Sequence, residues 1–198
     1  MKFLSILVAL AFLAINAAWA ADKDGKFAAK GAGRKSCEQF LIAKKNVSQD
    51  YLLYAGWLEG YVSAYNRFQK STYDITPWQT TELLLSMTEH HCKSNPASRI
   101  LSVTDGLMKA LFPARLESES TIVELNVMNR KSYFYAEIIK QVKARLEQLG
   151  FYSGDVESDH FGRAEIEAMR LFQQKSGLRE TGIPDQYSLS QLFLRLKK

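Results

Sequence analysis

The sequence lacks the short patterns that mark the common classes of catalytic site. It has three histidines and two cysteines, and it contains no H-E-x-x-H or H-x-x-x-D metal pattern and no G-x-S-x-G nucleophile elbow. Carboxylates at Glu82 and Glu89, or at Asp155, Glu157 and Asp159, are candidate glycosidase acids, but such pairs are common on solvated surfaces. The sequence therefore favours a protein that is not an enzyme and needs no cofactor.

Long hydrophobic runs are also missing, except at the N-terminus. Met1-Lys2 is followed by an almost wholly apolar segment, Phe3 to Ile15, and then by the small-x-small site Ala18-Trp19-Ala20. The apolar segment is shorter than the roughly twenty residues that span a bilayer. A basic start, a short apolar core and a small-residue site predict a secretory signal peptide, residues 1–20.

A strong excess of charge is absent as well. The formal net charge is +5, and it falls to +4 when Lys2 is removed with the signal peptide. Such an excess suits an anionic wall or membrane surface but is too small to indicate nucleic-acid binding. We expect a mature protein that begins at Ala21, has a flexible start over residues 21–33, is periplasmic or secreted, and contains no integral membrane segment.

The two cysteines, Cys37 and Cys92, form an even number in a compartment that permits oxidation, so we expect a disulfide between them. On the chain-entropy estimate, closing a loop of this length stabilises the fold by about 4 kcal/mol. The alternative is a metal site built from His90, His91 and Cys92. Adjacent helical residues point about 100° apart, and no further ligands cluster there, so no metal is predicted.

Residues 34–112, here called the bundle, are predicted to be a helical bundle. Apolar residues such as Tyr54, Leu58 and Tyr61 recur at helical spacing. Thr76-Pro77-Trp78-Gln79 is typical of a capping box with proline at the first helical position. Asn95-Pro96 gives a second start of this kind, and Phe112-Pro113 ends the last helix.

Two short blocks of the bundle carry a resemblance. Cys37-Glu38-Gln39-Phe40-Leu41 and Cys92-Lys93-Ser94-Asn95-Pro96 resemble the small periplasmic acid-stress chaperones of the HdeA kind, which join a C-x-x-F-L helix to a C-x-x-x-P segment by a disulfide. This resemblance implies acid-triggered opening and the holding of unfolded clients. Similar cysteine-tied helical domains serve as immunity proteins against wall-degrading toxins, so the fold alone leaves both activities open.

Residues 113–136 form the predicted connector. A charged, Ser-rich start is followed by Ile122, Val123, Leu125 and Val127, without the Gly/Pro/Ser bias of a flexible tether. A connecting helix or a short strand that packs one domain on the other is the expectation.

Three short apolar stripes at helical spacing follow in residues 137–198, here called the module. Gly150 supplies the positive-φ residue that ends the first helix, and Asp185 stands where the N-cap of the third belongs. The stripes are listed here in chain order: Ile138, Val142, Leu146 and Leu149; Ile166, Met169, Phe172 and Gln173; Leu189, Leu192, Phe193 and Leu196. The predicted fold class is therefore all-α, a disulfide-tied bundle followed by a three-helix domain.

The module also resembles a known family in four blocks, in order and at close to the family's spacing. They run Val142 to Gly154, Phe161-Gly162, Ala168 to Leu178 and Thr181 to Leu192, and they resemble the three-helix peptidoglycan-binding domain that targets many wall enzymes. The resemblance implies peptidoglycan as the ligand. The loop after Gly154 is one residue longer than usual, with Ser158 in place of a glycine and Glu165 in place of a threonine.

This variable loop borders the face on which the resemblance places the ligand. Tyr152 offers a ring on which a sugar stacks, and Arg163 offers a guanidinium for stem-peptide carboxylates. Asp159 and His160 lie within the same arc, and free amides in the first turn of the helix would add to the pull of Arg163. Equally open is a structural role, in which Tyr152 covers the core, Asp159 caps the helix and the other two are solvated.

Two functions follow from the sequence. In the first, the module binds peptidoglycan while the bundle recruits or regulates a protein partner. In the second, the bundle is a chaperone or an immunity-type inhibitor that the module localises to the wall.

Overall fold

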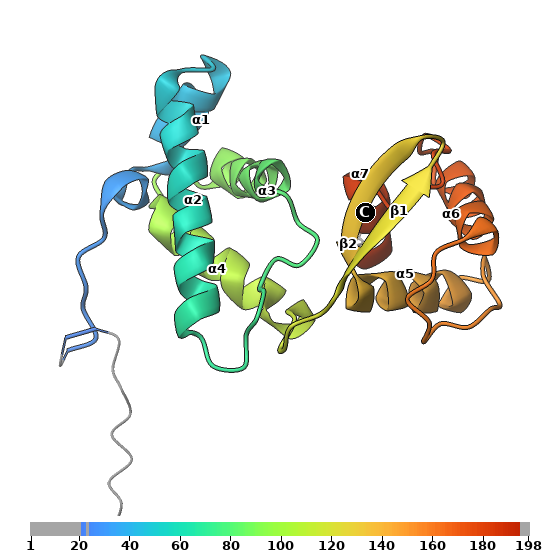
Figure 1. Ribbon diagram of the computed structural model, residues 1–198. Helices are drawn as coiled ribbons and strands as arrows, with labels where there is room; N and C mark the ends of the chain where they lie inside the picture. The colour runs from blue at the N-terminus through green and yellow to red at the C-terminus, as the bar shows by residue number, and fades with distance from the viewer. Residues whose placement is uncertain (1–20, 23, 195–198) are drawn as a thin grey trace, which may run out of the picture.

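The computed structural model describes residues 21–22 and 24–194, so the predicted signal peptide, residues 1–20, lies outside the described part. The chain forms two lobes that lie side by side and are joined by irregular segments (Figure 1). The first lobe holds η1 (Gly31–Arg34), α1 (Cys37–Lys45), α2 (Gln49–Phe68), α3 (Thr81–Ser94), α4 (Ile100–Leu111) and η2 (Phe112–Ala114). The second holds β1 (Ile122–Val127), β2 (Arg130–Tyr135), α5 (Ala136–Gln148), α6 (Arg163–Lys175) and α7 (Gln186–Phe193). No helix in the described ranges combines the length and the apolar character that crossing a membrane requires.

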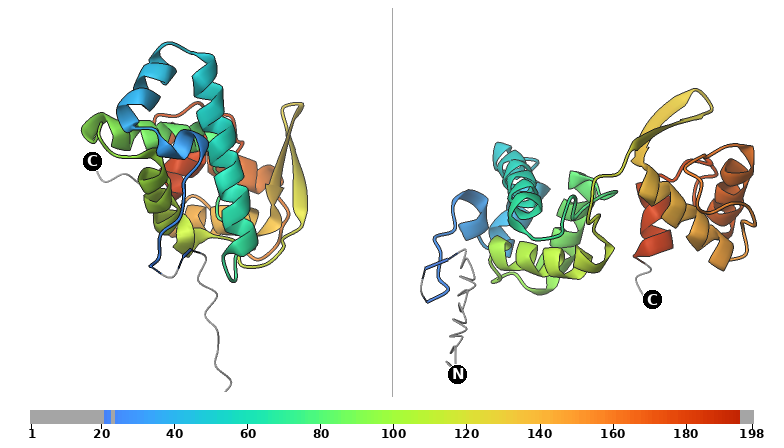
Figure 2. Two further views of the ribbon diagram at one scale, coloured as in Figure 1. Left: turned by 90° about the vertical axis from the view of Figure 1, so that its left-hand side faces the viewer. Right: turned by 60° about the horizontal axis from the view of Figure 1, so that its bottom comes forward.

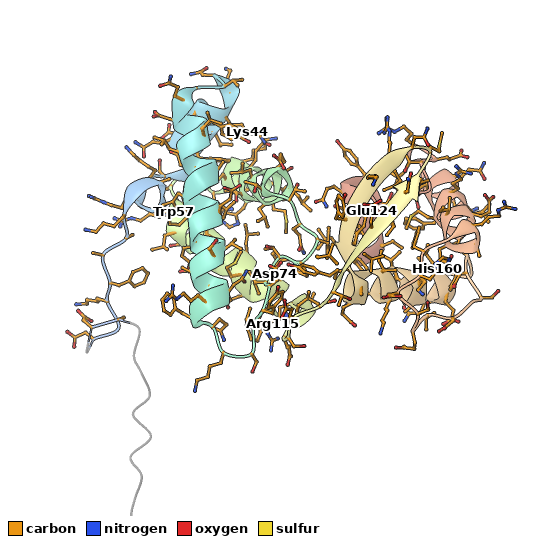
Figure 3. All side chains as sticks on the ribbon, in the orientation of Figure 1. Lys44, Trp57, Asp74, Arg115, Glu124 and His160 are labelled. Atoms are coloured by element: carbon orange, nitrogen blue, oxygen red, sulfur yellow. A yellow bond between two sulfur atoms is a disulfide. The ribbon has the colours of Figure 1, made fainter. Side chains whose placement is uncertain are left out.

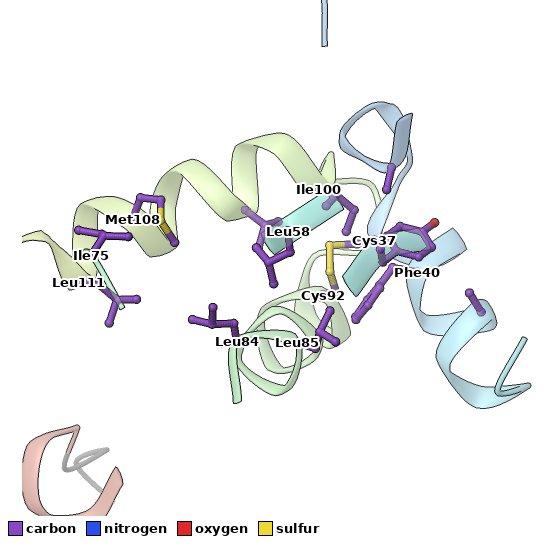
Figure 4. Close-up of a cluster of buried hydrophobic side chains, with 14 residues drawn as sticks. Cys37, Phe40, Leu58, Ile75, Leu84, Leu85, Cys92, Ile100, Met108 and Leu111 are labelled. Carbon is purple, nitrogen blue, oxygen red and sulfur yellow. A yellow bond between two sulfur atoms is a disulfide. The ribbon is translucent and has the colours of Figure 1, made fainter. Parts of the chain in front are cut away.

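The core of the bundle is built around the predicted disulfide, which is confirmed. Cys37 at the start of α1 is bonded to Cys92 near the end of α3, and both residues are completely buried. Phe40, Leu85 and Ile100 surround the sulfurs (Figure 4). The bond therefore ties α1 to α3 within the core of the bundle.

Local signals explain where α1 begins. The Ser36 hydroxyl accepts a hydrogen bond from the Gln39 amide at 3.3 Å, and the Gln39 side chain accepts one from the Ser36 amide at 3.0 Å. This reciprocal box satisfies two amides that the first turn leaves free. The Cys37 amide donates to the Ser98 carbonyl at 2.8 Å, which fixes the start of α1 against the segment before α4.

Two predicted helix starts in the bundle are wrong. Helix α3 begins at Thr81 rather than at Pro77, because the hydroxyl of Thr80 accepts from the Leu83 amide and provides the cap. Helix α4 begins at Ile100, after a turn that contains Asn95 and Pro96. In both cases a short irregular segment takes the place of the expected first turn.

The all-α prediction is correct for most of the chain but misses a small sheet. The connector contains an antiparallel hairpin in which Val127 pairs with Arg130 and Ile122 pairs with Tyr135. Side chains of a strand alternate between its faces, and β1 buries Leu125 and Val127 on one face. Figure 2 shows the hairpin standing beside the helices of the module.

The module has the three predicted helices. Gly150 ends α5 with a φ of 79°, and the Asp185 carboxylate caps α7 by accepting from the Ser188 amide at 2.9 Å. Gly177 follows α6 with a φ of 67°. The buried apolar residues of the three stripes meet in one core: Ile138, Val142, Leu146, Met169, Phe172, Leu189 and Leu192.

Trp78 joins the two lobes. Although it precedes α3 of the bundle, its ring is buried in the core of the module, 5.6 Å from the ring of Phe193 between centroids. The Gln186 side chain donates to the Trp78 carbonyl and accepts from the Thr80 amide at 3.0 Å. The irregular segment before α3 therefore serves as the docking contact between the lobes.

Candidate functional site

The loop between α5 and α6, residues 151–162, carries the residues predicted to bind the ligand. It lies at the end of the module that is remote from the bundle, as the position of His160 shows (Figure 3). A ligand the size of a wall polymer therefore has access to it without meeting the bundle.

A buried lysine holds this loop in place. The Lys143 side chain is completely buried, and its ammonium donates to the carbonyl of Asp155 at 2.8 Å and to the carbonyl of Ser158. Buried charges are stable only when they are paired or hydrogen-bonded, so these carbonyls must stay near α5. The loop is thereby fixed by a residue of the first helix.

The Asp155 side chain shapes the same stretch. Its carboxylate accepts from the amide of Glu157 at 2.9 Å and from the amide of Ser158 at 3.3 Å. Such Asx turns replace regular backbone hydrogen bonds in irregular segments. The Asp155 carboxylate thus stabilises the conformation of the loop.

Tyr152 and Glu165 form the polar centre of the site. The Tyr152 hydroxyl donates to one oxygen of Glu165 at 2.6 Å, and the other oxygen accepts from the Gly162 amide at 2.8 Å. Burial, followed by this hydrogen bond, raises the pKa of Tyr152 to about 12. Burial alone would raise the pKa of Glu165, but the bonds from Tyr152 and Gly162 and the nearby His160 outweigh it and lower the pKa.

Two glycines allow the rings of the site to lie close to the backbone. A Cβ atom at Gly154 would overlap the Tyr152 ring, and one at Gly162 would overlap the His160 imidazole. Tyr152 is half-buried, whereas Asp159, His160 and Arg163 are exposed. The ring of Tyr152 is therefore anchored, and the side chains of Asp159, His160 and Arg163 lie at the surface.

The structural role proposed for Asp159 is wrong, because Gly162 is the N-cap of α6 and Glu165 supplies the capping carboxylate. This arrangement also changes the electrostatics of the site. A resident negative charge now occupies the helix N-terminus, where free amides were expected to attract an anionic ligand. Arg163, at the first position of the helix, is exposed beside this carboxylate-capped end.

Sequence reasoning missed Lys143 and gave Glu165 no role. Lys143 sits between the buried residues Val142 and Leu146 on the apolar side of α5, and this position was the available signal. Glu165 stands three residues after Gly162, which is the N3 position of a capping box. Both side chains are buried, and both form hydrogen bonds that hold the loop.

The other sites considered from the sequence do not come together. His90 and His91 are exposed on α3, and the sulfur of Cys92 is held in the disulfide. Within residues 21–22 and 24–194, no three His, Cys, Asp or Glu side chains cluster as a metal site requires. Hydrogen bonds from Lys44 and then Lys93 lower the pKa of Glu89, the opposite of what a general acid needs.

The bundle has a separate groove of about 760 Å³ between η1, α1 and α2. Its floor includes Trp57, whose ring fits against Gly31 and Gly33. Ile42 and Leu53 line it with side chains that are 55% and 66% exposed. Apolar side chains gathered on a concave surface are typical of an interaction site.

Comparison with known proteins agrees with the geometry of the module. Residues 136–192 match the family described as "Putative peptidoglycan binding domain", which confirms the prediction of a C-terminal domain of this type. The matched segment begins with α5, includes the 151–162 loop and ends within α7. No curated protein and no solved structure gave a significant match to the chain.

Proposed function

We propose that this protein is a non-catalytic, extracytoplasmic protein that binds peptidoglycan through its module and recruits or regulates a protein partner through its bundle. The observation that carries the proposal is the fixed 151–162 loop within a segment that matches a peptidoglycan-binding family. The buried disulfide fits an oxidising compartment outside the cytoplasm. A signal peptide over residues 1–20 and the division into residues 34–112, 113–136 and 137–198 belong to the same proposal.

The ligand site of the module is the arc formed by Tyr152, Asp159, His160 and Arg163. The ring of Tyr152 is held by Glu165, so it meets a sugar face with little loss of side-chain entropy. Arg163 is exposed beside it and pairs with a carboxylate of the stem peptide. The anchored ring and the exposed cation together match the two chemical features of a peptidoglycan strand.

Sedimentation of the mature protein with purified sacculi tests this site. Tyr152→Ala/Arg163→Ala should weaken binding at least tenfold, equivalent to about 1.4 kcal/mol. The matched control, Tyr187→Ala/Lys175→Ala, removes an exposed tyrosine and an exposed cation from the same module and should bind as the parent does. Arg163→Gln alone, at an exposed position, separates loss of binding from loss of folding. A double variant that stays folded and pellets like the parent would place the site elsewhere.

The groove of the bundle supports the recruitment of a partner. A photo-crosslinking side chain placed at Leu53 should give a discrete adduct of defined mass in cells, because this residue lines the groove and is exposed. The same group at Lys109, which is exposed on α4 and does not line the groove, is the control. Equal labelling at both positions, or none at either, would contradict a partner site in the groove.

A further inference from the structure

A second cleft lies where the turn of the hairpin meets the loop between α6 and α7. It has a volume of about 380 Å³, and its cationic lining comes from two segments that are far apart in sequence. Arg130 and Lys131 begin β2, and Arg179 follows the end of α6. Because the family match begins at residue 136, the hairpin side of this cleft lies outside the matched domain.

The hairpin register determines how its two cations are presented. Arg130 pairs with Val127, and Ser132 pairs with Leu125, so all four occupy one face of the sheet. Val127 and Leu125 are buried on that face, whereas Arg130 is exposed at its edge. Arg130 therefore lies on the buried face of the hairpin, whereas Lys131, which also lines the cleft, lies on the opposite face.

The acidic groups near the cleft are already engaged. Lys131 forms an ion pair with Glu124 at 2.9 Å, and Asp185 accepts from the amide and the hydroxyl of Ser188, each at 2.9 Å. Among the described residues, no carboxylate lies within 4.0 Å of the guanidinium of Arg130 or of Arg179. In the described part of the chain, Arg130 and Arg179 thus line the cleft without forming an ion pair, and the Asp185 carboxylate, which lines it with them, is hydrogen-bonded to Ser188 through one of its two oxygens.

The turn that positions Arg130 is strained. Met128 and Asn129 both have positive φ angles, 52° and 61°, as a two-residue hairpin turn of type I′ requires. Asparagine tolerates this conformation, but for methionine it costs of order 1 kcal/mol, and the Met128 side chain is 74% exposed. Strain without compensating burial is often found next to functional residues, and here it fixes the direction of β2 and of Arg130.

We propose that this cleft binds an oxyanion, either a carboxylate or a phosphate, carried by a cell-wall polymer. Guanidinium groups bind both anions through paired hydrogen bonds, and an anion between Arg130 and Arg179 relieves their mutual repulsion. The inference rests on the proposed wall-binding function and adds a second contact to it. The thirteen residues of α6 separate Arg163 from the 179 loop by about 20 Å, so an extended polymer reaches both sites.

The test compares charge-neutralising pairs in the mature protein. Arg130→Gln/Arg179→Gln should bind native sacculi at least fivefold more weakly than the parent, and the salt dependence of binding should become shallower. The control Lys109→Gln/Lys175→Gln removes the same total charge from exposed positions on α4 and α6 that do not line the cleft. It should retain the affinity of the parent, and both pairs should keep its melting temperature.

Chemical treatment of the sacculi identifies the anion. If the cleft binds stem-peptide carboxylates, amidating the carboxyl groups of the sacculi should abolish the difference between the parent and Arg130→Gln/Arg179→Gln. If it binds phosphate, removing the phosphate-containing polymers should abolish that difference while amidation leaves it. Equal losses in the control pair, no loss in the cleft pair, or an effect confined to phosphatidylglycerol vesicles would each overturn the proposal.

The result for the cleft can be distinguished from the result for the site formed by Tyr152 and Arg163. Should Arg130→Gln/Arg179→Gln bind normally while Tyr152→Ala/Arg163→Ala binds weakly, the cleft proposal fails and the proposed function stands. If neither pair weakens binding to sacculi, both site assignments fail, and if the parent protein itself does not pellet with sacculi, the proposed function fails as well.

Discussion

The two lobes stabilise their loops and helices by different means. In the bundle, the buried disulfide provides the cross-link within the core, and the polar links between helices, Tyr61 to Asp105 and Lys44 to Glu89, are made by half-buried side chains. Thr88 donates to Leu84 on its own helix, and the buried hydroxyl of Thr104 has no partner among the described residues. In the module, buried polar side chains connect helices to loops: Lys143 bonds the 155–158 stretch, and Gln173 bonds residues 181–183.

This difference matches the kind of surface that each lobe exposes, which is a set of loops in the module and a groove between helices in the bundle. Gln173 is completely buried and bonds Thr181, Ile183 and Ser188 and the amide of Gly182, so it determines the path of the chain that leads to α7. A three-helix domain of this size has a small apolar core, and precise loops need directional contacts. The bundle presents a groove between helices, and for this purpose a covalent bond between helices is sufficient.

Removing the covalent link should produce the largest effect. Cys37→Ala/Cys92→Ala opens a loop of 55 residues and should lower the free energy of unfolding of the bundle by about 4 kcal/mol. Hydrogen exchange resolved along the chain should show lost protection in α1 to α4 and retained protection in α5 to α7. Thiol labelling of denatured, unreduced parent protein should find almost no free cysteine, and two reactive thiols per chain would contradict the disulfide itself.

Removing the contact between the lobes should have the second-largest effect on stability. Trp78→Ala empties a buried position in the module core and should cost about 3 kcal/mol, with loss of protection in α7 as well as at the start of α3. Trp57→Ala removes a ring of the same size from the bundle and should leave the module unchanged. If Trp78→Ala leaves exchange in α7 at the parent level, the lobes are not coupled through this ring.

Trp78 also shows which features could be predicted from the sequence and which could not. Helical periodicity, the disulfide, Gly150 and the Asp185 cap were predictable, because each depends on residues close in sequence or on cysteine pairing. Thr76-Pro77 has every local mark of a helix start, yet Trp78 lies outside the helix and packs into the core of the module, whose residues Ile138 to Leu192 follow it by 60 residues or more. Such a long-range contact leaves no pattern in the neighbouring sequence from which it could be predicted.

The same limit explains the two other omissions. The hairpin turn lacks the Asn-Gly pair that signals a type I′ turn, so the alternation of β1 was compatible with either a helix or a strand. Lysine is usually found at solvated positions. The hydrogen-bond partners of Lys143 are backbone carbonyls twelve and fifteen residues further along the chain. The candidate ligand-binding residues could be proposed from their side-chain chemistry, whereas Lys143 and Glu165, which hold the loop, could not.

Lys143→Met should have an intermediate effect, and it tests whether polar cross-links fix the binding loop. The substitution keeps the length of the side chain but removes the bonds to two carbonyls, and a hydrogen bond to a charged group contributes about 1.5–3 kcal/mol. We expect a loss of about 2 kcal/mol in module stability and weaker binding to sacculi. Lys140→Met, on the same helix but half-buried, should change neither. Normal loop protection in Lys143→Met would refute the supporting role.

The smallest effect should come from acid, and its sign follows from Glu89. Hydrogen bonds from Lys44 and Lys93 lower the pKa of Glu89 in the folded state, so its stabilising contribution is present above the unfolded value of about 4.3 and is lost as the pH falls through the lower folded value. Exposed and half-exposed ion pairs contribute at most about 1 kcal/mol, while the disulfide is unaffected by pH. The bundle should therefore keep its helical circular dichroism at pH 3, and Glu89→Gln should make the small decrease in the melting temperature of the bundle between pH 5 and pH 3 smaller still. Suppression of client aggregation that begins only below about pH 3 would contradict this expectation and favour a chaperone.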